Sequence, residues 1–87
     1  MKKKKILIFI PAYNVEKKIL SVLNKIPKFI LKKYNIKILI IEDHSKDNTL
    51  NIIKKFVKKK INKKKINLII NIKNIGYGGV QKIAFNF

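Results

Sequence analysis

The sequence predicts an α/β fold in which strands and helices alternate in the order βαβαβα. Three mostly apolar runs of strand length lie at residues 6–10, 37–41 and 66–72, and all are rich in isoleucine. The segment after each run places its apolar residues three or four positions apart, as on one face of a helix. This alternation predicts a parallel sheet with right-handed crossovers and with helices on its faces.

The first strand is an uninterrupted apolar run at residues 6–10, which predicts burial within the sheet. Asn14 is the expected N-cap of the first helix, and Pro27 is expected to bend or end it. The apolar stripe of this helix consists of Val15, Ile19, Val22, Leu23, Ile26 and Ile30.

Tyr34 and Asn35 predict a turn into the second strand, at residues 37–41. Asp47 is the expected N-cap of the second helix, whose apolar stripe is Leu50, Ile53, Phe56 and Val57. The lysine-rich stretch 58–65 is interpreted as a helix end and solvated loop rather than a functional patch.

The third strand is expected at residues 66–72 and is followed by a loop at 74–79 that holds all three glycines of the chain. The third helix follows this loop and is expected to be cut short after about two turns. Its apolar positions are Val80, Ile83, Ala84 and Phe87.

The composition is strongly basic, with a formal net charge of +18 from 22 basic and 4 acidic residues in 87. Such a charge favours polyanions as partners, but every basic residue is lysine, and arginine is the preferred residue for bidentate phosphate and base recognition. Heavy use of lysine, isoleucine and asparagine also fits a genome rich in A and T codons. The composition therefore disfavours nucleic acid as the partner.

The chain is short enough for one small domain, and it contains no cysteine for a disulfide or a thiolate metal site. No apolar run approaches the roughly 18 to 20 residues that a bilayer span needs, and no secretion signal is recognisable. We therefore expect a cytoplasmic protein.

The loops after the three strands, at residues 11–16, 43–47 and 74–79, are expected to meet at one edge of the sheet, where open α/β folds bind ligands. Glu16, Asp43 and Asp47 lie in these loops, and Glu42, the fourth acidic residue, adjoins one of them. Glycines in the third loop allow the backbone to approach a ligand closely. These features predict a binding site at this edge.

Two nucleotide-binding classes are excluded by the loops. The first loop reads PAYNVE and has no glycine, whereas dinucleotide-binding domains need a glycine-rich turn there. The third loop contains GYGG without the Gly-Lys-Ser/Thr ending of a P-loop. NAD, FAD and P-loop ATP sites are therefore not expected.

Three segments, PAYNVE, IEDHSKDNT and NIGYGGVQKIA, resemble in order and spacing the opening motifs of family 2 glycosyltransferases. The resemblance covers essentially the whole chain and implies the N-terminal part of a GT-A, Rossmann-like nucleotide-binding fold, so that residues 1–87 form a truncated, nucleotide-sugar-binding part of such a domain. The third motif is most similar to the branch that transfers sugars to polyprenyl phosphates, such as dolichyl-phosphate mannosyltransferases.

The resemblance implies a site for the donor, a UDP- or GDP-sugar. Its implied residues are Pro11, Ala12, Tyr13 and Glu16 around the base and ribose, Asp43 as hydrogen-bond acceptor for the base or ribose, and Asn74 and Gly76 closing the pocket. Carboxylates suit this task because nucleosides offer N–H and O–H donors.

Some of the same residues have structural interpretations. For Asn14 and Asp47, helix capping is favoured over ligand contact. Tyr13 is equally compatible with packing against the loop. Ser45 and Thr49 are expected to organise the second loop and the start of the second helix. His44 is assigned no role.

The resemblance also implies parts that residues 1–87 lack. Family members hold Mg²⁺ or Mn²⁺ with an Asp-x-Asp motif after a fourth strand, and neither that motif nor any catalytic residue is found in this sequence. We therefore expect donor binding without sugar transfer from this chain alone. The intact enzyme would be an inverting transferase, with a polyprenyl phosphate acceptor and peripheral contact at the cytoplasmic membrane face. Two alternatives stay open: a nonenzymatic basic module that binds nucleic acid or anionic membranes, and an inactive remnant.

Overall fold

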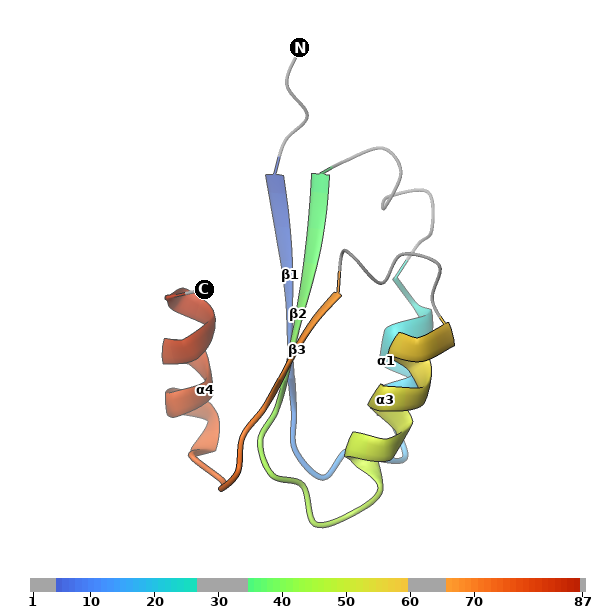
Figure 1. Ribbon diagram of the computed structural model, residues 1–87, viewed down its shortest axis with the longest axis vertical. Coiled ribbons are helices and arrows are strands. Elements are labelled where there is room, and N and C mark those ends of the chain that lie inside the picture. The colour runs from blue at the N-terminus through green and yellow to red at the C-terminus, as the bar shows by residue number, and fades with distance from the viewer. Residues whose placement is uncertain (1–4, 27–34, 60–65, 87) are drawn as a thin grey trace.

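A computed structural model describes residues 5–26, 35–59 and 66–86 of the chain and has the predicted α/β architecture (Figure 1). The elements, in chain order, are β1 (Lys5–Ala12), α1 (Ile19–Asn24), β2 (Asn35–Glu42), α3 (Thr49–Lys59), β3 (Ile66–Ile70) and α4 (Gly76–Phe85). The three strands are parallel and lie in the order β1-β2-β3. The expected alternation of strands and helices is therefore confirmed.

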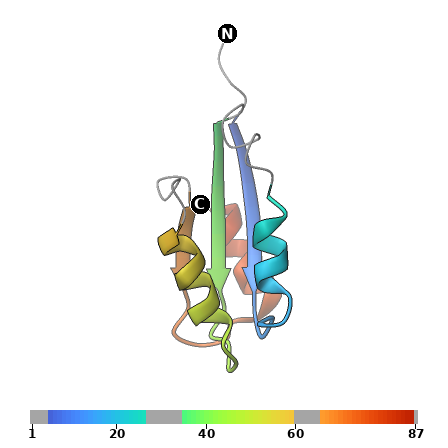
Figure 2. The ribbon, with the colours of Figure 1, turned by 90° about the vertical axis from the view of Figure 1, so that its right-hand side faces the viewer.

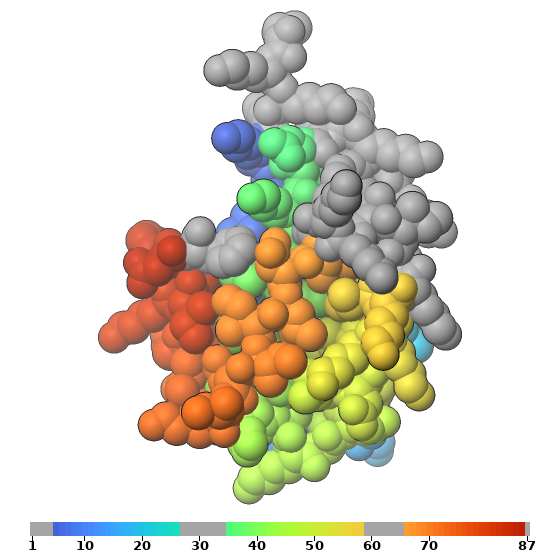
Figure 3. Space-filling view, viewed as in Figure 1, coloured from blue at the N-terminus to red at the C-terminus, as the bar shows by residue number. Residues whose placement is uncertain are grey.

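Helices cover both faces of the sheet. Helices α1 and α3 lie on one face and α4 lies on the other, as the two perpendicular views show (Figures 1 and 2). In the space-filling view, β3 and the segment after it (orange) lie between α3 (yellow) and α4 (red) (Figure 3). Of the helices in the described segments, none is long and apolar enough to cross a membrane.

Strand β2 forms the centre of the core because both of its faces are covered. Successive side chains of a strand point to opposite faces, so Ile38 and Ile40 pack toward α1 and α3 while Leu39 and Ile41 pack toward α4. All four side chains are at most 2% exposed. The larger cluster also contains Ile36 of β2 and side chains from the other elements of its face: Ile10, Ala12, Ile19, Leu23, Ile53 and Phe56.

The face under α4 has a smaller core. Val80 is the buried residue that α4 contributes, and it packs with Leu39 and Ile41. Phe85, near the end of the same helix, is 93% exposed. Helix α4 is therefore held by Val80 and by the partly buried Ile83 and Ala84, while its last residue, Phe85, lies outside this contact.

The first two strands are longer than predicted, because Pro11 and Ala12 continue β1 and pair in register with Ile41 and Glu42. Proline has no N–H, and it is tolerated here because β1 is an edge of the described sheet. Strand β3 is shorter than predicted and ends at Ile70, while Ile72 is 90% exposed.

The helix starts also differ from the predictions. Helix α1 begins at Ile19 rather than after Asn14, and Val22, predicted for its buried stripe, is 44% exposed. Helix α4 begins at Gly76 and not after a loop at 74–79, so the three glycines are helical residues. The predictions for Pro27, Ile30, Tyr34, Phe87 and residues 60–65 fall outside the described residues.

Candidate functional site

The segments that follow the three strands meet at the carboxyl edge of the sheet, at the bottom of Figure 1. Two backbone hydrogen bonds extend the strand pairing there: the amide of Asp43 donates to the carbonyl of Ala12 (2.9 Å), and that of Asn71 donates to the carbonyl of Glu42 (2.9 Å). The three polar segments are therefore held side by side from their first residues.

Asn14 ties the first loop to the second. Its backbone N–H donates to Ser45 Oγ (3.0 Å), and its side-chain Oδ1 accepts a hydrogen bond from the amide of Lys46 (2.8 Å). Asn14 has a positive φ of 51°, which asparagine tolerates better than most residues. The expectation that Asn14 caps the first helix is wrong because its side chain is engaged across the loops, five residues before the helical start at Ile19.

Asp47 and Thr49 form the second tie between these loops. Asp47 accepts hydrogen bonds from the backbone amides of Glu16 (3.2 Å) and Thr49 (3.0 Å) and from the Thr49 hydroxyl. Thr49 Oγ1 in turn accepts from the amide of Val15 (2.9 Å). Ser45 and Thr49 thus organise the loop and helix start, as predicted.

Asp47 supports the start of α3 without being its N-cap. The carbonyl of Asn48 accepts the first helical hydrogen bond, from Ile52 (3.2 Å), so Asn48 is the cap residue. Burial raises the pKa of the Asp47 carboxyl, but the hydrogen bonds from Thr49 and Glu16 outweigh this effect and hold the pKa below its usual value.

Asp43 joins the second loop to the third. Its Oδ1 accepts from Asn71 Nδ2 (2.8 Å) and the amide of Ile75 (3.0 Å), and its Oδ2 accepts from the amide of Gly76 (2.9 Å). Asn74 Nδ2 donates to the carbonyl of Asp43 (3.2 Å). The side chain is only 3% exposed, so this carboxylate organises the third loop from a buried position.

The hydrogen bonds to Asp43 keep it ionised. Burial raises the pKa of the Asp43 carboxyl, whereas the donors on Asn71, Ile75 and Gly76 and the nearby His44 lower it, and the net pKa lies below the usual value. Gly76 has a φ of 77°, a conformation that glycine adopts without strain, and this directs its amide to the carboxylate.

The three segments enclose a cleft of about 340 Å³. Its walls are Pro11, Ala12, Tyr13, Val15, Asp43, Asn74, Gly76, Tyr77 and Val80. Six of the seven residues predicted for the site line this cleft, and Glu16 does not. Sequence reasoning missed Tyr77, although this residue lies inside the glycine-rich motif.

Sequence reasoning also missed the roles of Asn71 and Glu42. Asn71 falls in the predicted third strand, yet it lies just beyond β3 and contacts Asp43. Glu42 is 1% exposed and accepts a hydrogen bond from the amide of Ser45 (2.8 Å). Their positions next to strand ends are the one signal that the sequence offered.

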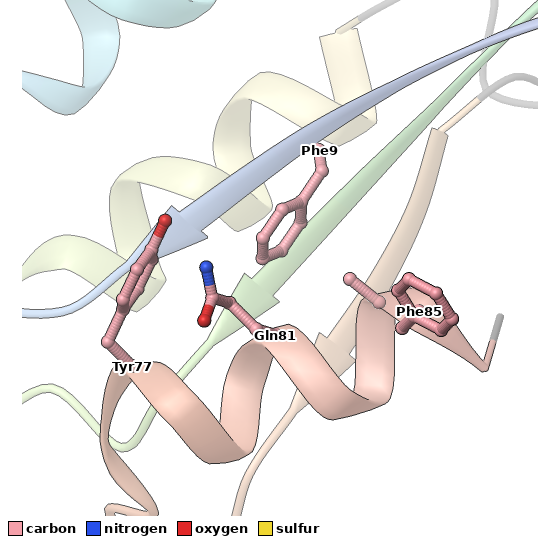
Figure 4. Close-up of a pocket in the computed structure, with 5 residues that line it drawn as sticks. Phe9, Tyr77, Gln81 and Phe85 are labelled. Atoms are coloured by element: carbon pink, nitrogen blue, oxygen red, sulfur yellow. The ribbon is translucent and has the colours of Figure 1, made fainter.

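A second hollow, of about 470 Å³, lies between β1 and α4. Phe9 on β1 faces α4, which carries Tyr77, Gln81 and Phe85 (Figure 4), and Ala84 completes the walls. Among the described residues, these walls contain no carboxylate or lysine. This hollow is therefore an apolar surface without the polar groups of the first cleft.

The carboxylates of the described segments do not fit the divalent metal implied by the resemblance. No three His, Asp or Glu side chains gather closely enough there to hold an ion. Glu42, Asp43 and Asp47 each accept backbone amides that would compete with a cation. We therefore derive no step through a metal from these residues.

Comparisons with known proteins find one family model that matches most of the chain. The model of glycosyl transferase family 2 matches residues 7–87. An uncharacterized protein of Methanocaldococcus jannaschii is 46% identical over 68 residues, which cover 77% of this chain and 26% of that protein.

A solved structure has the same fold. It is a mannosyltransferase from Pyrobaculum calidifontis in complex with GDP-Man and Mn²⁺, with a TM-score of 0.64 at 13% identity. The match covers 99% of this chain and 24% of the mannosyltransferase. The chain thus spans about a quarter of the length of both proteins.

Proposed function

Because the chain belongs to glycosyl transferase family 2, we propose that the cleft at the carboxyl edge of the sheet binds the nucleoside of a nucleotide-sugar donor. The observation that carries this proposal is the convergence of Pro11, Tyr13, Asp43 and Asn74 from three separate segments on one cleft. Ligand sites of open α/β sheets lie at this edge.

The cleft has the chemistry that a nucleoside requires. Tyr13 and Tyr77 supply aromatic surface, with 42% and 63% of their area exposed, on which a base can stack. For the polar edge of the base, Asp43 supplies a carboxylate acceptor and Asn74 supplies a side-chain amide. Glu16 is exposed on the first loop, and we assign it to the ribose hydroxyls at the rim.

Hydrogen bonds within the chain also organise the cleft. Asn14 and Asp47 fix the first loop to the second, and Asp43 fixes the second to the third. Rigid walls lower the entropic cost of binding. A binding site for a small molecule gains affinity from this arrangement.

For the whole protein we propose transfer of the sugar from the donor to an acceptor, with a polyprenyl phosphate as that acceptor. The acceptor oxygen forms a bond to the anomeric carbon while the bond from that carbon to the nucleoside diphosphate breaks, and its electron pair leaves with the diphosphate. The leaving diphosphate requires strong electrostatic stabilisation. Residues 1–87 alone are therefore proposed to bind the donor without transferring its sugar.

The charge of +18 supports a second candidate, a basic module that binds nucleic acid or anionic membranes. Such binding would weaken steeply with added salt and would not depend on the cleft. Nucleotide binding through the cleft requires particular walls, so cleft variants separate the two candidates.

Isothermal titration with UDP and GDP, in the presence of Mg²⁺, tests the proposal. We expect at least one nucleotide to bind and Tyr13→Ala to weaken that binding by about fivefold to tenfold, because stacking contributes about 1–1.5 kcal/mol. Phe85→Ala is the matched control, since it removes an aromatic ring that lies outside the cleft and is 93% exposed. If neither UDP nor GDP binds to the folded protein, the proposal is contradicted. It is also contradicted if Tyr13→Ala and Phe85→Ala weaken nucleotide binding equally.

A further inference from the structure

Counted over residues 5–26, 35–59 and 66–86, the carboxylate of Asp43 has one hydrogen-bond acceptor position left for a ligand. An ionised carboxylate offers about four such positions, two on each oxygen. Asn71 and Ile75 occupy both positions of Oδ1, and Gly76 occupies one position of Oδ2. The acceptor that Asp43 presents to the cleft is therefore a single lone pair on Oδ2.

We propose that this single acceptor makes the cleft select uracil over guanine, so that the donor is a uridine nucleotide. The inference rests on the proposed function and concerns the same cleft. Uracil presents one N–H, between two carbonyl groups. Guanine presents two adjacent donors, N1–H and N2–H₂, which suit both oxygens of a carboxylate.

Guanine would leave one of these donors facing Oδ1, whose positions are filled by Asn71 and Ile75. A buried donor without an acceptor weakens binding by about fivefold to a hundredfold, since it costs about 1–3 kcal/mol. Uracil avoids this cost because its single N–H needs only the free position on Oδ2.

Asn74 supplies a complementary donor for uracil. Its Nδ2 carries two N–H groups, and the contact with the Asp43 carbonyl uses one of them. Asn74 also lines the cleft, so the second N–H suits a uracil carbonyl beside the N–H that Asp43 accepts. An acceptor beside a donor matches the imide edge of uracil.

Competition titrations of the whole chain with UDP, GDP and inosine diphosphate test the inference. We expect UDP to bind at least about fivefold more tightly than GDP. Inosine diphosphate lacks only the 2-amino group of GDP and needs a single acceptor, so we expect it to bind more tightly than GDP by a similar factor. GDP binding as tightly as UDP, or as tightly as inosine diphosphate, would overturn the inference while leaving the nucleotide site intact.

Asn71→Ala provides a test on the protein side. It frees one acceptor position on Oδ1, so we expect the preference for UDP over GDP to fall by at least about threefold. Asn51→Ala is the matched control, because Asn51 lies on α3 and its side chain donates to Asn48 Oδ1 (2.8 Å) at the start of that helix, away from Asp43. A preference that stays unchanged in a folded Asn71→Ala protein would refute the lone-pair argument. Failure of all three nucleotides to bind would instead refute the proposed function.

Discussion

Replacing Asp43 with asparagine changes one oxygen of a buried carboxylate to an NH₂ group and hardly changes the size of the side chain. The remaining oxygen can still accept from Asn71 and Ile75. The new NH₂ group then faces the amide of Gly76, which is also a donor. One hydrogen bond is lost, and two donors are left facing each other.

The expected loss of stability follows from these contacts. A hydrogen bond to a charged group contributes about 1.5–3 kcal/mol, and a buried donor without an acceptor costs about 1–3 kcal/mol. The two surviving bonds also weaken because their acceptor becomes neutral. We therefore expect the free energy of unfolding to fall by about 2.5–6 kcal/mol, a large part of the 5–15 kcal/mol of a typical domain.

Urea denaturation at pH 7, followed by circular dichroism, measures this loss. Glu16→Gln is the matched control, since it removes the same charge from an exposed side chain and is expected to change the free energy by less than about 0.5 kcal/mol. A loss for Asp43→Asn no larger than that of the control would refute the view that this carboxylate holds the third loop.

Three further predictions concern the same edge of the sheet. The folded-state pKa of Asp43 is lowered, so the ionised carboxylate stabilises the fold above the unfolded pKa of about 3.9, and this stabilisation is lost as the pH falls through the folded pKa. The melting temperature should therefore fall less steeply from pH 6 to 3 in Asp43→Asn than in the unchanged protein, as thermal melts will measure. Gly76→Ala should lower the free energy of unfolding by about 1–2 kcal/mol because the φ of Gly76 is 77°. Gly78 has open space around it and no positive φ, so Gly78→Ala should raise the free energy of unfolding by up to about 1 kcal/mol. Equal free energies of unfolding for the two variants in urea titrations would contradict this prediction. Asn14→Ala removes the acceptor for the amide of Lys46 and should speed hydrogen exchange at that amide, while unchanged exchange would show that the bond does not hold the loop.

The alternation of strands and helices could be predicted because periodicity reports burial directly. Leu39 and Ile40 are buried on opposite faces of β2, and an uninterrupted apolar run is the pattern of a strand covered on both sides. The family could also be identified from the three loop motifs, and the family match confirms it.

The local contacts of the loops could not be predicted in the same way. The sequence assigned Asn14 to a helix cap because asparagine favours that position, but here the side chain bonds the amide of Lys46, which lies 32 residues away. Asn71 was missed for the same reason, since its partner Asp43 is 28 residues away. Polar side chains have several equivalent local uses, and long-range neighbours decide among them.

The glycines show a further limit. Clustered glycines predict a loop, yet α4 begins at Gly76 because its amide is fixed by Asp43 and because Val80 packs under the sheet. Tertiary contacts here overcome a weak intrinsic helix propensity. The predicted grouping of the loops was independent of this error, since parallel strands bring their carboxyl ends to one edge in any case.

An amide-resolved NMR titration of this chain with UDP and then GDP, in the presence of Mg²⁺, tests the central claim most directly. We predict chemical-shift changes concentrated in the three segments around the cleft, at Tyr13, Asp43 and Asn74 and their neighbours, and little change on the outer face of α3. Shifts spread over the lysine-rich surface and abolished by salt, or no shifts in a well-dispersed spectrum, would contradict the claim that this edge of the sheet is a nucleotide site.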